Sequence, residues 1–147
     1  MTSLVGDVRM LRRHPVKGFT PEAMESVTLK AGAHFPCDRM YAVEDGPSGF
    51  NPRKPGHVSK QKFTVLAKIP EVAKARTKYD EDTGVIIVEA GGEPPFIARL
   101  TEEAGRTGFA AWLTRFLGDL ATGPLQVLPA PEGHRFMDHP QGFVSII

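Results

Sequence analysis

Apolar and polar residues alternate along several short stretches of the chain, and this period of two is typical of β-strands with one buried face. The clearest pair of such stretches lies at 72–79 and 85–90, and the polar residues 80–84 between them end in glycine. That arrangement predicts a β-hairpin. Strands are expected at 4–16, 25–30, 38–44, 63–69, 72–79, 85–90, 96–100 and 125–128, and Phe50 could lead a short return strand outside this count.

The period changes once to that of an α-helix. Six apolar residues recur at helical spacing and define one face, namely Phe109, Trp112, Leu113, Phe116, Leu117 and Leu120. The helix is expected to begin at 101–103 or at Thr107 and to end before Gly123. Thr20 followed by Pro21 predicts one short helical turn near the N-terminus.

Seven or eight strands, one helix and no alternating βαβ order predict a mainly β (α+β) fold. We expect a small antiparallel β-barrel with one amphipathic helix, near the C-terminus, packed on it. The 147 residues are enough for one domain, or for one domain and a short piece of another. The apolar segment 142–147 at the end of the chain suggests either the start of a second domain or a terminal strand that docks in the sheet.

Bulk composition excludes some classes of partner. The net charge of +1 gives no electrostatic reason to expect a nucleic-acid or membrane partner. No apolar run approaches the ~20 residues that span a bilayer, and no signal peptide is recognisable at the N-terminus. Cys37 is the single cysteine, so there is no internal disulfide framework and a reducing compartment is expected. We therefore predict a cytoplasmic protein.

Two cations stand where a strand meets a turn. Lys17 follows a strand that ends in Pro15, and Arg39 begins the strand after Asp38. Cations in turns braced by proline and glycine can present donors to an anion, phosphates especially. The alternatives are that Lys17 is a solvated turn residue and that Arg39 forms an ion pair with Asp38 or another nearby carboxylate.

Two other sets of residues could carry chemistry. Cys37 could be a buried apolar residue, an exposed inert thiol or a nucleophile, and a nucleophile would need a lowered pKa. His134 and His139 lie in a polar loop that contains Pro140, and a zinc site would need three or four ligands. We expect no catalytic thiol and no metal site here.

A strand that ends Pro-Val-Lys-Gly at 15–18 is followed, about twenty residues later, by Asp38-Arg39 and an aromatic-apolar strand running into Glu-Asp-Gly at 44–46. This arrangement resembles the N-terminal β-barrel domain of MOSC proteins, named for the C-terminus of molybdenum cofactor sulfurase. The resemblance covers about residues 4–89, and the helix with its following strand also fits the layout.

In that family the barrel precedes a MOSC domain proper, and together they hold the molybdenum cofactor, a pterin that carries a phosphate. The resemblance implies a barrel domain at 1–128, with a linker and the start of a MOSC domain at 129–147. The intact protein is then expected to be an oxidoreductase or sulfur-transfer enzyme. Its partners would be the C-terminal MOSC domain and the pterin cofactor, and a redox partner protein could join them. This chain alone would be inactive, because the cysteine that ligates molybdenum in the family lies in the MOSC domain.

The resemblance also implies cofactor-binding residues. In family members, the lysine after Pro-Val and the arginine after Asp point at the pterin and its phosphate. The matching residues in this chain are Lys17 and Arg39. Arg53 is a weaker match to a third cation of the family. Gly18 stands where relatives often have serine, so only backbone N–H groups remain at that position. Lys17, Gly18, Arg39 and Arg53 are therefore the predicted cofactor-binding residues.

Two other functions stay open on the sequence. The chain could be a stand-alone barrel that binds a phosphorylated small molecule or a protein partner. It could also be a small RNA-binding barrel that uses the basic loop after Phe50, with the cations Arg53, Lys54, Lys60 and Lys62. RNA binding is disfavoured by the near-zero net charge and by how few aromatic residues lie between these cations.

Overall fold

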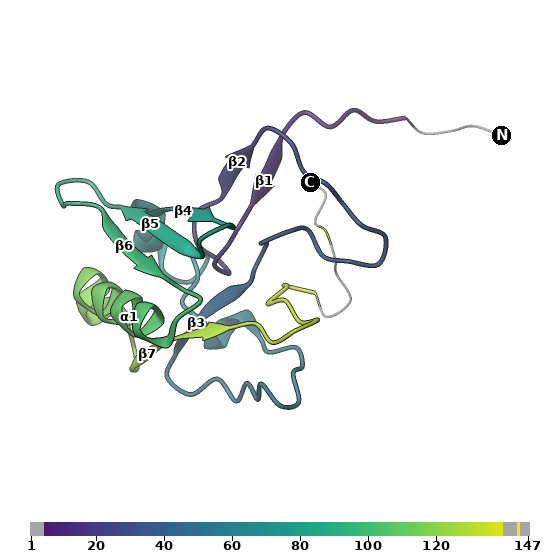
Figure 1. Cartoon of the computed structure of the whole chain (residues 1–147). Coiled ribbons are helices and arrows are strands. Elements are labelled where there is room, and N and C mark those ends of the chain that lie inside the picture. The colour runs from purple at the N-terminus through teal and green to yellow at the C-terminus, as the bar shows by residue number, and fades with distance from the viewer. Residues whose placement is uncertain (1–4, 140–143, 145–147) are drawn as a thin grey trace.

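Seven short strands and one α-helix make up the part of the chain that the computed structural model describes, which is residues 5–139 and residue 144 (Figure 1). The strands are β1 (Leu11–Arg13), β2 (Glu22–Met24), β3 (Tyr41–Asp45), β4 (Arg76–Asp80), β5 (Val85–Glu89), β6 (Phe96–Arg99) and β7 (Leu125–Pro129). The helices are α1 (Glu103–Leu117) and three short 3₁₀ helices, η1 (Lys60–Lys62), η2 (Pro70–Lys74) and η3 (Gly118–Leu120). None of the described helices has the length and apolar character needed to cross a membrane.

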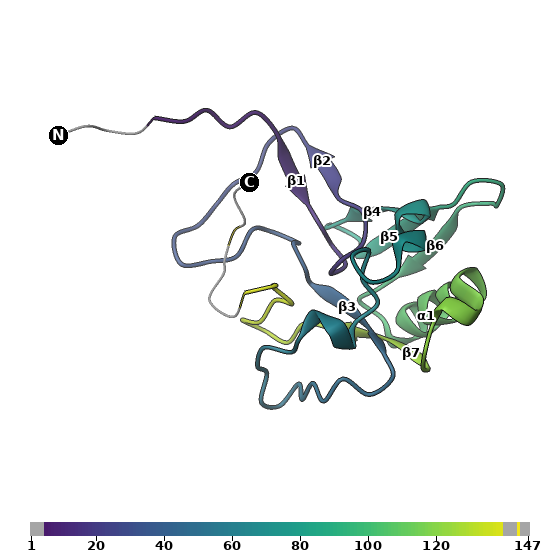
Figure 2. The ribbon, with the colours of Figure 1, turned by 180° about the vertical axis from the view of Figure 1, so that it is seen from behind.

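The strands form three small antiparallel sheets. β1 pairs with β2, β3 pairs with β7, and β5 lies between β4 and β6. Isolated bridges join Val16 to Tyr41 and Glu44 to Phe63, so β3 contacts segments outside its own sheet. α1 packs on β6 and β7, as both views show (Figures 1 and 2). The mainly β composition and the helix are confirmed, but no closed barrel joins the described strands.

The hairpin of β4 and β5 confirms the clearest sequence prediction, although residues 72–74 of the predicted first strand belong to η2 and β4 begins at Arg76. Asp80 pairs with Val85, and the turn between them ends at Gly84, whose φ is 72°. A Cβ atom on Gly84 would lie 2.5 Å from Cγ2 of Thr101. Glycine is therefore needed here both for the left-handed backbone and for the close approach of the segment after β6.

β3 separates two hydrophobic clusters, because successive side chains of a strand point to opposite faces. Tyr41 and Val43 belong to the main core, together with buried residues of β4, β5 and α1. Ala42 belongs to a second cluster, which we call the aromatic cluster. It consists of buried Ala42, Phe63, Val65 and Phe136, with partly buried Phe50, Val58, Leu128 and Ala130 packed against it.

The predicted face of α1 is confirmed over most of its length. Its buried residues include Phe109, Trp112, Leu113 and Leu117. Leu120 is the exception, with 47% of its surface exposed. The reason is that Gly118 ends the helix in a left-handed conformation, so Leu120 no longer follows the helical face.

The N-terminal strands differ from the prediction. Of the described part of the stretch 4–16, only Leu11–Arg13 forms a strand, and Val16 makes one isolated bridge; Leu4 lies outside the described residues. The stretch 25–30 forms no strand. Alternation favours an extended chain, but a strand also needs a partner that offers its hydrogen bonds. The helical turn predicted at Thr20 is wrong as well, because the Thr20 hydroxyl accepts a 2.9 Å hydrogen bond from the Thr77 N–H and the chain runs directly into β2.

The strand predicted at 63–69 is also wrong. Phe63 makes one isolated bridge, and the Val65 carbonyl then accepts hydrogen bonds from the N–H groups of Lys68 and Ile69, which closes a turn. Phe50 leads no return strand and packs on the aromatic cluster instead. Within the predicted linker and domain start at 129–147, residues 140–143 and 145–147 lie outside the described residues.

Candidate functional site

Lys17 is the most buried charged residue of the candidate site. The bridge between Val16 and Tyr41 and a 2.8 Å hydrogen bond from the Lys17 N–H to the Tyr41 carbonyl fix its backbone. Its side chain points inward, and the residue is only 1% exposed. The alternative of a solvated turn lysine is therefore wrong.

The ammonium of Lys17 has two hydrogen-bond acceptors among the described residues. Nζ donates to the Phe136 carbonyl at 3.0 Å and to Oδ1 of Asp138 at 2.7 Å. It also lies 6.0 Å from the centre of the Phe63 ring, the outer limit for a cation–π contact. Burial lowers the pKa of Lys17 below its ordinary value, although the hydrogen bond to Asp138 acts in the opposite direction.

Gly18 has a packing role. Its φ is 71°, and a Cβ atom there would lie 2.3 Å from Cγ1 and 2.8 Å from Cα of Val65. Its carbonyl accepts a 2.7 Å hydrogen bond from the Leu66 N–H. This close approach explains physically why glycine, and not a residue with a side-chain hydroxyl, follows Lys17 in this chain.

Arg39 forms the ion pair that was its alternative interpretation. Its Nη1 lies 2.6 Å from Oδ2 of Asp38, and the other oxygen of Asp38 accepts a 2.7 Å hydrogen bond from the His14 N–H. Asp38 is buried and Arg39 has a φ of 50°, so the local turn holds both groups in place. Arg39 does not line the pocket described next. Burial has the largest effect on the pKa of Lys17 and lowers it, Asp138 raises it, and the charge of Arg39 lowers it by a smaller amount.

Arg53 lies apart from the other predicted residues. It is exposed in the loop 51–59, where its N–H donates a 2.9 Å hydrogen bond to the Asn51 side chain. It is not among the residues that line the pocket. Of the predicted cofactor-binding residues, Lys17 therefore lines the pocket. Gly18 follows Lys17 in the chain, and Arg39 is near enough for its charge to affect the pKa of Lys17.

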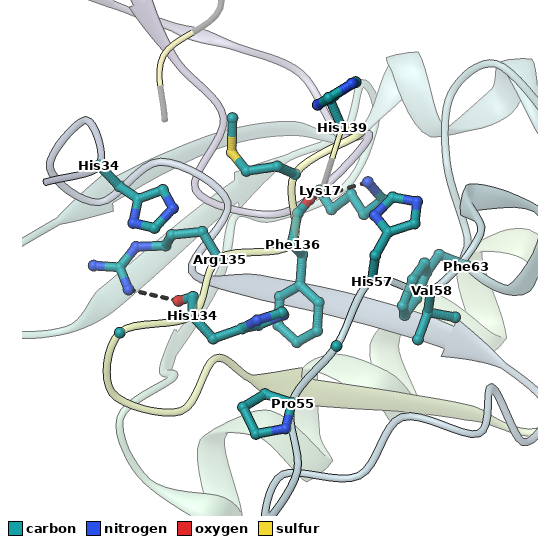
Figure 3. A pocket seen from close by; sticks show the side chains of 13 residues that line it. Lys17, His34, Pro55, His57, Val58, Phe63, His134, Arg135, Phe136 and His139 are labelled. Atoms are coloured by element: carbon teal, nitrogen blue, oxygen red, sulfur yellow. Dashed lines mark hydrogen bonds between the residues drawn. The ribbon is translucent and has the colours of Figure 1, made fainter. Parts of the chain in front are cut away.

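A pocket of about 270 Å³ opens above the aromatic cluster (Figure 3). Two segments supply most of its lining, namely the loop 55–58 and residues 133–137 with His139, and Lys17, His34 and Phe63 complete it. His34 and Arg135 stand on one side of the view, and His57 and Val58 stand on the other (Figure 3). The lining residues are Lys17, His34, Pro55, Gly56, His57, Val58, Phe63, Gly133, His134, Arg135, Phe136, Met137 and His139.

The lining is basic. It contains Lys17, Arg135 and four of the five histidines of the chain, but no aspartate or glutamate. Burial, followed by the charge of Arg135, lowers the pKa of His34. Burial and the neighbouring His34 and Arg135 lower the pKa of His134 in the same way. Lys17, which is paired with Asp138, and Arg135 are the lining residues that carry a full positive charge, so an anion is the charge-complementary ligand for this space.

Arg135 carries an unused donor at this pocket. Its Nη1 donates a 2.8 Å hydrogen bond to the His134 carbonyl. Its Nε is buried and has no hydrogen-bond partner among the described residues. A buried donor without an acceptor costs free energy, so Arg135 would gain from an acceptor that reaches its Nε.

Cys37 does not have the properties of a nucleophile. Burial raises the pKa of its thiol to about 11, so the thiol is protonated at neutral pH. Its Sγ lies 3.6 Å from a carboxylate oxygen of Glu81, which also disfavours the thiolate. Among the described residues, no group of three or more histidine, cysteine, aspartate or glutamate side chains is arranged to hold a metal ion.

Sequence reasoning missed His34 and His57 as residues of the site, and it treated His134 and His139 only as possible metal ligands. No local signal marks them, because they come from segments that are far apart in the chain. Arg135 lies in the segment 129–147, for which the resemblance implied a linker and the start of a second domain. The structure places it in the pocket wall.

Comparison with known proteins gives one match. The chain matches the family model of the MOSC N-terminal beta barrel domain over residues 5–122. No curated protein and no solved structure matches it. The matched stretch covers most of the chain and includes Lys17, Gly18 and Arg39. The chain therefore belongs to the MOSC N-terminal beta barrel domain family.

Proposed function

We propose that this domain is the cofactor-binding part of a molybdenum cofactor protein, and that its basic pocket takes the phosphate end of the pterin. The observation that carries the proposal is the buried charge of Lys17 in a pocket without acidic lining residues. Burying an ammonium is costly unless it binds a partner of opposite charge. In this structure Asp138 is that partner, with Oδ1 at 2.7 Å from Nζ of Lys17, and a phosphate could replace it with several acceptor oxygens.

The residues present fit such a group in size and chemistry. A space of about 270 Å³ is at the lower limit of small-molecule pockets and suits a phosphate with a small part of the attached molecule. Lys17 and the unpaired Nε of Arg135 would donate to the phosphate oxygens. Arg39 would add positive charge near the site while it stays paired with Asp38. Arg53 is exposed and takes no part.

When bound, the cofactor would supply the redox or sulfur-transfer chemistry. The residues of this chain would bind and orient it. On this proposal the intact protein is a cytoplasmic oxidoreductase or sulfur-transfer enzyme, and a C-terminal MOSC domain supplies the catalytic groups. The chain of 147 residues alone is then inactive.

Calorimetric titration of the 147-residue chain tests the proposal. The probes are a phosphorylated pterin, the same pterin without its phosphate, and inorganic phosphate. Lys17→Met keeps the apolar stem and removes the charge, and we expect it to weaken binding of the phosphorylated pterin by about 10- to 100-fold, the value of a charge-assisted hydrogen bond. Arg135→Met should weaken it as well, and this variant guards against a folding defect specific to Lys17.

Lys54→Met is the matched control, because Lys54 is an exposed lysine of the neighbouring loop and does not line the pocket. It should bind like the wild type. Equal binding of the two pterins, or wild-type affinity in both Lys17→Met and Arg135→Met, would refute the phosphate assignment.

A second candidate function uses the same pocket. All of its described lining residues belong to this chain, so it could bind a phosphorylated small molecule without a second domain. Binding of inorganic phosphate as strong as that of the phosphorylated pterin would favour this candidate. The RNA-binding alternative is weakened, because Phe50 packs against His134 and Phe136 at ring distances of 5.3 and 5.0 Å and is not free to stack on bases.

A further inference from the structure

The Lys17–Asp138 ion pair has an unusual asymmetry. The side chain of Lys17 is 2% exposed, whereas that of Asp138 is 64% exposed. The carboxylate therefore approaches the buried ammonium from the solvent side. Asp138 is not among the residues that line the pocket, but it binds the same ammonium that a ligand oxyanion in the pocket would bind, so the two compete for the single charge of Lys17.

Asp138 is held differently from the residues just before it. Phe136 is 4% exposed, packs in the aromatic cluster, and its N–H donates a 3.0 Å hydrogen bond to the Arg39 carbonyl. Met137 is also buried. The Asp138 carboxylate, by contrast, has Lys17 as its hydrogen-bond donor among the described residues. It can turn away from Lys17 while Phe136 and Met137 stay packed.

The charges at the pocket change when Asp138 turns away. With the ion pair formed, the formal charge of Lys17 is balanced, and Arg135 is the remaining fully charged group of the lining. Without it, Lys17 and Arg135 are both lining residues with an unbalanced charge, although Lys17 still donates to the Phe136 carbonyl. Asp138 is thus placed to lower the affinity of the pocket for anions as long as it contacts Lys17.

We propose that Asp138 is an internal competitor that occupies the oxyanion position on Lys17, so that a phosphate-class ligand binds only by displacing it. This inference rests on the proposed function, since it assigns a regulation to the same pocket. The hydrogen bond from Lys17 keeps the competitor ionised, because it lowers the pKa of Asp138 against the effect of burial. Ligand entry and release of residue 138 are therefore coupled events.

Titration of the 147-residue chain with inorganic phosphate, at an ionic strength held constant with potassium chloride, tests the competition. Asp138→Asn removes the charge with little change in shape. We expect it to bind phosphate roughly 3- to 20-fold more tightly than the wild type, between the effects of an exposed and a buried ion pair. Glu132→Gln is the matched control, because it removes an exposed carboxylate from the same segment outside the pocket. It should leave the affinity unchanged.

Lys17→Met combined with Asp138→Asn separates competition from a general charge effect. If Asp138 acts through Lys17, the second substitution gives no gain once the lysine is absent. A second readout is the amide resonance of residue 138, which should shift on saturation with phosphate in the wild type. The amide of Phe136, which is bonded to the Arg39 carbonyl, should move much less.

The outcomes separate this inference from the proposed function. Phosphate binding that depends on Lys17 but is equal or weaker in Asp138→Asn would overturn the competition and leave the anion pocket in place. A gain in Glu132→Gln equal to that in Asp138→Asn would also overturn it, since the effect would then be one of net charge. Failure of both the wild type and Asp138→Asn to bind phosphate would overturn the pocket and the competitor together.

Discussion

Replacement of Gly18 by alanine tests the close packing beside Lys17. Two costs add at this position. The φ of 71° places an alanine in the left-handed region, at about 1–2 kcal/mol. The new Cβ would also lie 2.4 Å from Cβ and 2.8 Å from Cα of Val65, and such overpacking costs about 1–3 kcal/mol. Together we expect Gly18→Ala to lower the free energy of unfolding by about 2–5 kcal/mol.

Gly32→Ala is the matched control. Gly32 has a φ of 73°, and a Cβ there would meet nothing within 4 Å, so only the backbone cost applies. Urea unfolding followed by the fluorescence of Trp112, the single tryptophan, measures both variants. The difference between them isolates the contact with Val65.

Two results would refute this argument. One is an equal loss of stability in Gly18→Ala and Gly32→Ala, because the contact would then carry no cost. The other is full recovery when Val65→Ala is added to Gly18→Ala. Alanine at 65 removes Cγ1, but the Cβ and Cα atoms that the new methyl group meets remain in place.

Two further predictions concern titratable groups. Burial would raise the pKa of Asp45, but hydrogen bonds from the Thr122 and Gly123 backbone outweigh it and lower the pKa, so ionised Asp45 stabilises the fold above its unfolded pKa of 3.8. Asp45→Asn should therefore lower the free energy of unfolding by about 1–3 kcal/mol near pH 7. This difference from the wild type, measured by urea unfolding, should shrink as the pH falls below 3.8. A difference that grows in acid would contradict the assignment. Cys37, with its pKa of about 11, should react with iodoacetamide at pH 8 roughly 100-fold more slowly in the folded chain than in the chain unfolded in urea. A folded-state rate that levels off below pH 9 would show that the thiol is not buried as described.

Local patterns were sufficient wherever neighbouring residues decide the structure. The β4–β5 hairpin follows from two alternating segments joined by a turn that ends in Gly84. The position of helix α1 follows from the helical spacing of its apolar residues. The hairpin and the helix could be predicted because each satisfies most of its backbone hydrogen bonds among residues close in the chain. The Pro-Val-Lys-Gly and Asp-Arg pieces were enough to indicate the family, which the match over 5–122 confirms.

Elements that depend on a distant partner were less predictable. In the apolar run 63–69, residues 63–65 and Ile69 are buried, but the chain turns between them and leaves Leu66 exposed. Phe63 and Val65 belong to the aromatic cluster. The alternation at 25–30 finds no partner among the described residues and forms no strand. Apolar periodicity records burial, and burial alone does not specify which backbone supplies the hydrogen bonds.

The sequence by itself determined that Lys17 and Arg39 stand at strand–turn junctions and that the chain is mainly β with one helix. Only the tertiary structure decided their roles. It pairs Arg39 with Asp38, exposes Arg53, and brings Lys17 to a pocket with His34, Arg135 and the other histidines. The physical reason is that a site assembled across more than a hundred residues depends on how the segments pack. That packing leaves no periodic signal in the chain.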